Sequence, residues 1–209
     1  MLPVLVCAVL VAACLVAERR KSERGLWLAK PLASATFVWA ALAWGALASP
    51  FGHWLALGLV ACAVGDVLLI PRRAPGALRA GMLAFGVGHG LFTTAFLVHG
   101  VSLGAAALAA AAALAFVLGV WRWLARHLAP ADRVPVGLYA GVIGGMLVCA
   151  IGAAARGAPG AAAAGAVLFA LSDLSVAQDR FVAPSFASTL WGLPAYYAAQ
   201  LLLAWGGRA

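Results

Sequence analysis

Apolar residues fill eight stretches of the chain, and short polar or glycine- and proline-containing segments separate them. A transmembrane helix needs about 20 mostly apolar residues, with a lower limit near 17. The stretches that reach or approach this length are residues 2–17, 26–48, 54–70, 80–99, 102–124, 134–154, 160–180 and 186–205. Because the connections are short, the pattern predicts one all-α integral membrane domain over residues 1–209, a polytopic bundle of eight transmembrane helices.

Composition supports this prediction and also decides which partner the positive net charge indicates. Hydrophobic residues make up 66% of the 209 residues and charged residues 10%, against about 45–50% and about 25% in soluble domains. A net charge of +8 would favour a nucleic-acid partner in a soluble chain. Here the basic residues separate apolar segments, so we expect no nucleic acid but contact with membrane lipid head groups.

The cysteine and histidine patterns exclude two kinds of site. The four cysteines lie in apolar runs without a CxxC pair, and no HxxxH or HExxH spacing occurs. We therefore expect neither disulfides nor a metal site, and no cofactor. The first basic cluster follows the first apolar run, the reverse of a cleavable signal peptide, so residues 2–17 are predicted to remain as a helix.

Basic residues also predict an orientation. If eight helices alternate, twelve of the 14 Lys and Arg residues fall on one side. The twelve are Arg19, Arg20, Lys21, Arg24, Lys30, Arg72, Arg73, Arg79, Arg122, Arg126, Arg133 and Arg180. The positive-inside rule then places both termini outside a bacterial inner membrane, and a seven-helix count would scramble the pattern.

Two aspartates, Asp66 and Asp173, interrupt apolar stretches. A carboxylate near the centre of a spanning helix costs about 2.5–3.5 kcal/mol, and such residues usually have a function. Each lies about twelve residues into a helix of the same direction, so both are expected about 18 Å from the outer edge, in one layer on the cytoplasmic side of the midplane. A structural polar network is the alternative.

Other polar residues fall near this layer. Tyr197 and Gln200 share a helix face at a spacing of three, and Tyr196 does not keep this stripe. Asp179 beside Arg180 predicts a solvated helix end. Candidates for binding the substrate or orienting the carboxylates are Lys30, His89, Tyr139, Ser172, Tyr197 and Gln200.

A series of short blocks resembles the YhhN-like lysoplasmalogenase family of eight-helix membrane proteins. Two departures from its usual pattern occur, Phe92 where a Tyr is common and Ala29 where a Thr is common. The matching blocks, in order, are Ala29–Leu32 with Lys30, Val64–Leu69 with Asp66, Phe85–Phe96 with His89, Gly165–Asp173 with Ser172, and Tyr196–Gln200, together with Tyr139.

The resemblance implies hydrolysis of the vinyl ether bond of a lysoplasmalogen, a lysophospholipid, to a fatty aldehyde and a glycerophospho-head group. Such a reaction needs a carboxylic acid to protonate carbon and a carboxylate to stabilise the cation, which fits Asp66 and Asp173 as catalytic residues. Lys30 is the expected phosphate contact, with snorkelling to the interface as the alternative. A proton-coupled transporter of lipids or small molecules is the rival class, and a purely structural membrane protein is the third.

Overall fold

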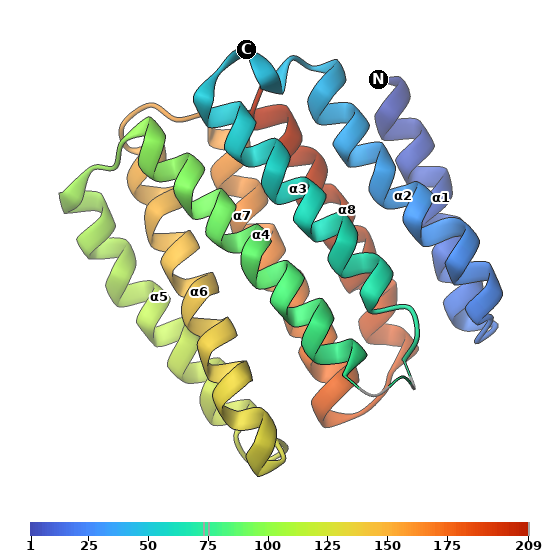
Figure 1. The fold of residues 1–209 in the computed structure, drawn as a ribbon. Helices are drawn as coiled ribbons and strands as arrows, with labels where there is room; N and C mark the ends of the chain where they lie inside the picture. The colour runs from blue at the N-terminus through green and yellow to red at the C-terminus, as the bar shows by residue number, and fades with distance from the viewer. Residues whose placement is uncertain (73, 75, 209) are drawn as a thin grey trace.

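Eight long helices lie side by side in the computed structural model, which describes residues 1–72, 74 and 76–208 (Figure 1). Two short helical turns interrupt the series. In chain order the elements are α1 (Leu2–Arg19), α2 (Glu23–Ala43), η1 (Ala46–Ala48), α3 (Pro50–Leu68), α4 (Ala77–His99), α5 (Leu103–Leu124), α6 (Pro130–Ala154), α7 (Gly160–Ala177), η2 (Gln178–Val182) and α8 (Phe186–Gly206). The prediction of an all-α chain with eight long helices is confirmed.

Seven of the helices in the described part of the chain are long and apolar enough to cross a membrane. The exception is α8, which has 21 residues and misses the criterion through composition rather than length. Its Ser, Thr, Gln and paired Tyr residues lower its hydropathy. Eight membrane crossings therefore stay a prediction, whereas a bundle of membrane-spanning helices is what the fold shows.

Local backbone signals move the boundary between α2 and α3 from the predicted positions. The predicted helix 26–48 ends at Ala43, because Gly45 adopts φ +82°, a left-handed conformation that glycine accepts without strain. The following helix begins four residues earlier than predicted. Pro50 occupies its first turn, and the Ser49 side chain accepts a hydrogen bond from the Gly52 N–H at 3.1 Å.

These boundaries shift both intramembrane aspartates toward the ends of their helices. Asp66 follows Pro50 by about 24 Å of helical rise and lies in the last turn of α3. Asp173 follows Gly160 by about 20 Å and lies four residues from the end of α7. Asp66 is therefore further from its helix start than the predicted 18 Å, because α3 begins earlier than the apolar pattern implied. Helix α7 begins at the predicted residue 160, so Asp173 stays close to its predicted depth.

The two ends of the bundle differ in charge. Both termini lie at one end, together with the α2–α3, α4–α5 and α6–α7 connections (Figure 1). The other end, called here the charged end, is formed by the α1–α2, α3–α4, α5–α6 and α7–α8 connections. These connections and the adjoining helix ends carry most of the basic residues. Part of the predicted Pro71–Gly76 turn, Arg73 and Pro75, lies outside the described residues.

Close packing fills the half of the bundle nearest the termini. Phe37, Phe92 and Phe96 are fully buried there. At that end α7 and α8 approach so closely that a Cβ on Gly206 would overlap Ala162. By contrast, α5 packs mainly on α6, so the α5–α6 hairpin leaves space toward α7 at the charged end.

Candidate active site

A cavity of about 160 Å³ lies at the charged end of the bundle, large enough for several water molecules at about 30 Å³ each. Its lining divides into three parts, a polar floor, a charged mouth and an apolar wall. The floor includes Lys30, Asp66, Tyr139, Asp173 and Tyr196; the mouth Glu18, Arg72, Asp179 and Arg180; and the wall Phe116, Val117, Val120, Leu124, Val136 and Ile143.

Asp66 is buried at the floor of the cavity, where three donors hold it. Lys30 Nζ lies 3.1 Å from Oδ1. The Ser34 hydroxyl donates to Oδ2 at 2.7 Å, as Lys30 and Ser34 stand one helical turn apart on α2. The Tyr196 hydroxyl donates to the same oxygen at 2.7 Å from α8. With a cation and two hydroxyl donors around it, this carboxylate is fixed in position.

Tyr197 contacts the residues that hold Asp66, on the side away from the cavity. Its hydroxyl lies 3.1 Å from Ser34 Oγ and 3.5 Å from the Lys30 carbonyl oxygen. Its ring packs on Phe37, with centroids 5.9 Å apart. Tyr197 therefore positions the residue that donates to Asp66 rather than reaching the cavity itself.

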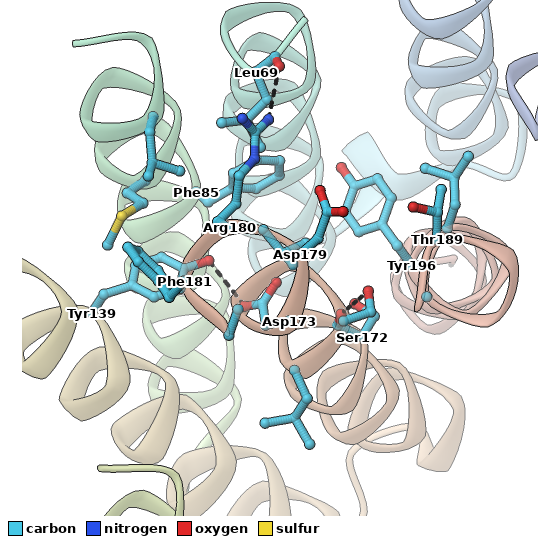
Figure 2. Close-up of a pocket in the computed structure, with 18 of the residues that line it drawn as sticks. Leu69, Phe85, Tyr139, Ser172, Asp173, Asp179, Arg180, Phe181, Thr189 and Tyr196 are labelled. Carbon is cyan, nitrogen blue, oxygen red and sulfur yellow. Dashed lines mark hydrogen bonds between the residues drawn. The ribbon is translucent and has the colours of Figure 1, made fainter. Parts of the chain in front are cut away.

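Asp173 lies across the cavity and is held differently (Figure 2). The Tyr139 hydroxyl donates to its Oδ2 at 2.9 Å. His89 Nε2 lies 3.3 Å from the same oxygen and 3.2 Å from the Tyr139 hydroxyl. Within the described residues Oδ1 has no hydrogen-bond partner. The side chain of Asp173 is 16% exposed, against 3% for Asp66, so Asp173 is the carboxyl group with an oxygen available to a bound molecule.

His89 is fixed from several sides. Its ring is fully buried and lies 4.3 Å from the Phe169 ring, centroid to centroid. Its Nδ1 faces Met146 Sδ at 3.2 Å. In the tautomer with hydrogen on Nε2, the ring donates toward Asp173. His89 thus orients a carboxyl group and does not itself line the cavity.

Two predicted residues lie apart from the carboxylates. The Ser172 hydroxyl donates to the Phe169 carbonyl at 2.7 Å, within its own helix, although Ser172 lines the cavity (Figure 2). Gln200 is fully buried, and neither Nε2 nor Oε1 has a partner among the described residues. The structure therefore does not bring Gln200 or the Ser172 hydroxyl to either aspartate.

Sequence reasoning missed two contacts of Asp66. The spacing of three between Tyr197 and Gln200 predicts Tyr197 rather than Tyr196 for the site, yet Tyr196 shares a face with Gln200 at a spacing of four. Ser34 stands four residues after Lys30 and therefore on the same face of α2. Helical spacing shows that these residues share a face with the predicted ones. It does not show which way that face points, because the rotation of each helix about its axis cannot be derived from it.

The mouth of the cavity is a charge network that joins α1, the α3–α4 connection and η2. Arg72, in the α3–α4 connection, contacts Asp179 Oδ2 through Nη1 at 2.9 Å and Glu18 Oε2 through Nη2 at 3.0 Å. Burial lowers the pKa of the Arg72 guanidinium, but the charges of Glu18 and Asp179 outweigh it and leave the pKa above its usual value. The expectation of a solvated end at Asp179 is wrong, because Asp179 also accepts a hydrogen bond from the Ser185 N–H at 3.3 Å.

This arrangement suits acid–base chemistry on an amphipathic molecule. One carboxylate is paired with a cation, and the other keeps an oxygen directed at space that water can enter. Groups in such different environments can divide the roles of proton donor and charge stabiliser. The apolar wall and charged mouth match a molecule with one hydrocarbon part and one ionic part.

Comparison with known proteins finds related sequences. The YhhN family model matches residues 25–207. Lysoplasmalogenase TMEM86A of Bos taurus is 35% identical over 165 residues, covering 76% of this chain and 66% of the relative. Lysoplasmalogenase TMEM86B of Homo sapiens is 36% identical over 161 residues, covering 74% of this chain and 65% of the relative. The match spans just under two thirds of each relative's own length.

No solved structure matches the chain. The family match covers most of the chain and therefore decides membership by itself. The matched residues include every residue named for the floor and all of those named for the mouth except Glu18. The chain belongs to the YhhN family.

Proposed function

We propose that the protein is a lysoplasmalogenase, an ether hydrolase that cleaves the vinyl ether bond of a lysoplasmalogen to a fatty aldehyde and a glycerophospho-head group. The observation that carries the proposal is one cavity whose floor holds two carboxyl groups, Asp66 and Asp173, between an apolar wall and a charged mouth. The names of the relatives point to the same activity.

The cavity lining indicates how such a lipid would lie. Its alkenyl chain would pack on the wall formed by α5 and α6, where Val120, Leu124 and Ile143 offer apolar surface. Its head group would face the mouth. The vinyl ether, which lies between these two parts of the molecule, would then stand over the floor.

In the proposed mechanism Asp173 is the general acid. Protonated on Oδ1, it transfers the proton to the vinyl carbon remote from the ether oxygen, and the double bond becomes an oxocarbenium ion. Tyr139 and His89 hold Oδ2, so Oδ1 is the oxygen that faces the substrate. Asp66 keeps its negative charge near the developing cation and stabilises it electrostatically.

Water completes the reaction. A water molecule in the cavity adds to the cationic carbon, and the ionised Asp173 accepts the proton that this water releases, which restores the acid. The resulting hemiacetal collapses: its hydroxyl proton moves to the ether oxygen, the carbon–oxygen bond breaks, and aldehyde and glycerol hydroxyl form. One water is consumed, and the protein returns to its starting state.

The proposal includes an orientation. All eight helices, including α8, cross the membrane of a bacterial cell, with both termini outside and the charged end in the cytoplasm, as the positive-inside rule requires. The short loops at the charged end carry the basic residues that support it. Substrate would then enter from the cytoplasmic leaflet.

Aldehyde release from a defined lysoplasmalogen tests the proposal. Purified protein in detergent should release fatty aldehyde, and Asp173→Asn or Asp66→Asn should lower turnover by at least about 100-fold, the usual scale for acid–base groups. Asp132→Asn is the matched control. Asp132 pairs with Arg79 at 2.9 Å at the same end of the bundle but does not line the cavity.

Each outcome separates one class of function from another. Aldehyde from the wild type and the control, but not from the two cavity variants, supports the hydrolase. Substrate uptake into vesicles without cleavage would favour the transporter class instead. Neither cleavage nor uptake by any of the four proteins would favour a structural role, and equal aldehyde release by all four would refute catalysis by Asp66 and Asp173.

A further inference from the structure

Arg180 is a half-buried arginine that lines the cavity without a carboxylate partner. Its Nη2 donates to the Leu69 carbonyl oxygen at 3.1 Å, at the C-terminal end of α3 (Figure 2). None of the ion pairs in the described part of the chain includes it. A guanidinium has five N–H donors, so most of those on Arg180 remain for a ligand.

The neighbouring charges explain why Arg180 stays available. Arg72 already uses both terminal nitrogens, one on Asp179 and one on Glu18. The two carboxylates at the mouth are therefore engaged with Arg72, not with Arg180. A second, unpaired guanidinium beside this network is an attractive position for an anion.

The backbone places Arg180 at this point through a π-helical turn. Residues 178–182 form η2, and the Ala183 N–H donates to the Gln178 carbonyl at 2.9 Å. Such turns widen the helix and are frequent at functional sites. Arg180 follows Asp173 by two helical turns, about 10 Å of rise, so both side chains reach the same cavity.

We propose that Arg180 binds the phosphodiester of the lysophospholipid substrate, with Arg72 positioning the mouth around it. This rests on the proposed function and assigns the head-group site within it. A planar guanidinium can donate two parallel hydrogen bonds to the two non-bridging oxygens of a phosphodiester. Lys30, the residue expected from the sequence to make this contact, is instead paired with Asp66 at 3.1 Å.

The spacing between Asp173 and Arg180 fits the substrate. In a lysoplasmalogen, a three-carbon glycerol backbone separates the vinyl ether oxygen from the phosphodiester. The long side chain of Arg180 can extend from its Cα toward the floor and so shorten the distance to Asp173. With the vinyl ether at Asp173, the phosphate of the same molecule falls toward the mouth. The alkenyl chain then leaves in the opposite direction, along the apolar wall.

Equilibrium binding tests the site without requiring catalysis. The probes are a saturated 1-O-alkyl-glycerophosphoethanolamine, which lacks the vinyl group and is not cleaved, and a 1-O-alkylglycerol, which also lacks the phosphodiester. Arg180→Gln should weaken binding of the first probe at least about tenfold more than binding of the second. Arg79→Gln, an exposed residue outside the cavity, should leave both affinities at the wild-type value.

Competition identifies the source of the phosphate group. Glycerophosphoethanolamine at millimolar concentration should compete with the first probe in the wild type but not in Arg180→Gln. Stronger competition by inorganic phosphate than by glycerophosphoethanolamine would overturn the proposal in favour of a site for free phosphate.

Kinetics supplies the second readout. With a lysoplasmalogen and a 1-O-alkenylglycerol as substrates, Arg180→Gln should raise KM for the first at least about tenfold more than for the second. Arg180→Lys should raise KM for the lysoplasmalogen less than Arg180→Gln does, because lysine keeps the positive charge but lacks the paired N–H donors of a guanidinium.

Two results would overturn the proposal. Equal weakening of both probes would mean that Arg180 only holds the Leu69 carbonyl and the end of α3. Unchanged binding of both would mean that the phosphate lies elsewhere. If the wild type cleaves no vinyl ether yet binds the first probe through Arg180, the head-group site stands and the proposed hydrolysis fails.

Discussion

Replacing Lys30 by methionine tests how Asp66 is held. The ammonium lies 3.1 Å from a carboxylate whose side chain is only 3% exposed. Methionine keeps much of the length and removes the charge. Two opposite charges 4 Å apart attract by about 4 kcal/mol at an effective dielectric constant of 20. Removing one partner of a buried pair costs about 3–5 kcal/mol, because the other charge stays behind.

The expected loss lies at the lower end of that range. Ser34 and Tyr196 still donate to Asp66 at 2.7 Å in the variant, so about 3 kcal/mol is the expectation. At about 2–4 °C per kcal/mol for a chain of this size, the melting temperature should fall by about 6–12 °C. Tryptophan fluorescence during heating of purified protein in detergent measures it, using the eight tryptophans.

The double variant Lys30→Met/Asp66→Asn separates the charge effect from lost packing. It carries no unpaired charge, so it should melt at a higher temperature than Lys30→Met alone. Asp66→Asn by itself should be milder than Lys30→Met, because the Lys30 side chain is 14% exposed and can extend toward the charged end. The reasoning fails if Lys30→Met melts within about 2 °C of the wild type, or if the double variant loses the sum of the two single losses.

Three further perturbations follow from the described contacts. Tyr196→Phe removes a hydroxyl donor to Asp66 at 2.7 Å and should slow aldehyde release about tenfold or more, as hydrogen bonds to charged groups contribute about 1.5–3 kcal/mol; an unchanged rate would show that Asp66 needs no such donor. Gly192→Ala puts a methyl group into α7 and should lower thermal stability by about 1–3 kcal/mol, whereas Gly145→Ala, which meets nothing within 4 Å, should not. Gln200→Leu removes a buried amide without partners among the described residues and should raise the melting temperature by several degrees, about 1 kcal/mol; a fall would reveal a bound water or partner.

The helices could be predicted because membrane length is a strong constraint on apolar runs. Their ends could not, because they depend on local backbone chemistry that hydropathy does not register. Ser49 and Pro50 start α3 within a segment that reads as a turn, and Gly45 ends the preceding helix early. The start of α3 moved by four residues, which lengthens the helix before Asp66, and its end moved from the predicted residue 70 to Leu68, which leaves Asp66 in the last turn.

The candidate site was predictable in part for a related reason. Asp66 and Asp173 stand out because charge is rare in apolar segments, and a single residue is enough to reveal them. Their partners depend on how each helix is rotated about its axis, which spacing within one helix does not determine. Tyr196 rather than Gln200 meets the carboxylate, and Asp179 pairs with Arg72 across a long sequence separation.

The contrast between wall and mouth has a consequence for how the reaction products depart. A lipid cut over the floor would yield a hydrophobic aldehyde on the side of α5 and α6 and a water-soluble phosphodiester at the mouth. Each product would partition into the phase it already borders, bilayer or solution, so neither would have to pass the other. Product inhibition would then be asymmetric: added aldehyde would act through its concentration in the membrane, and added glycerophosphodiester through its concentration in water.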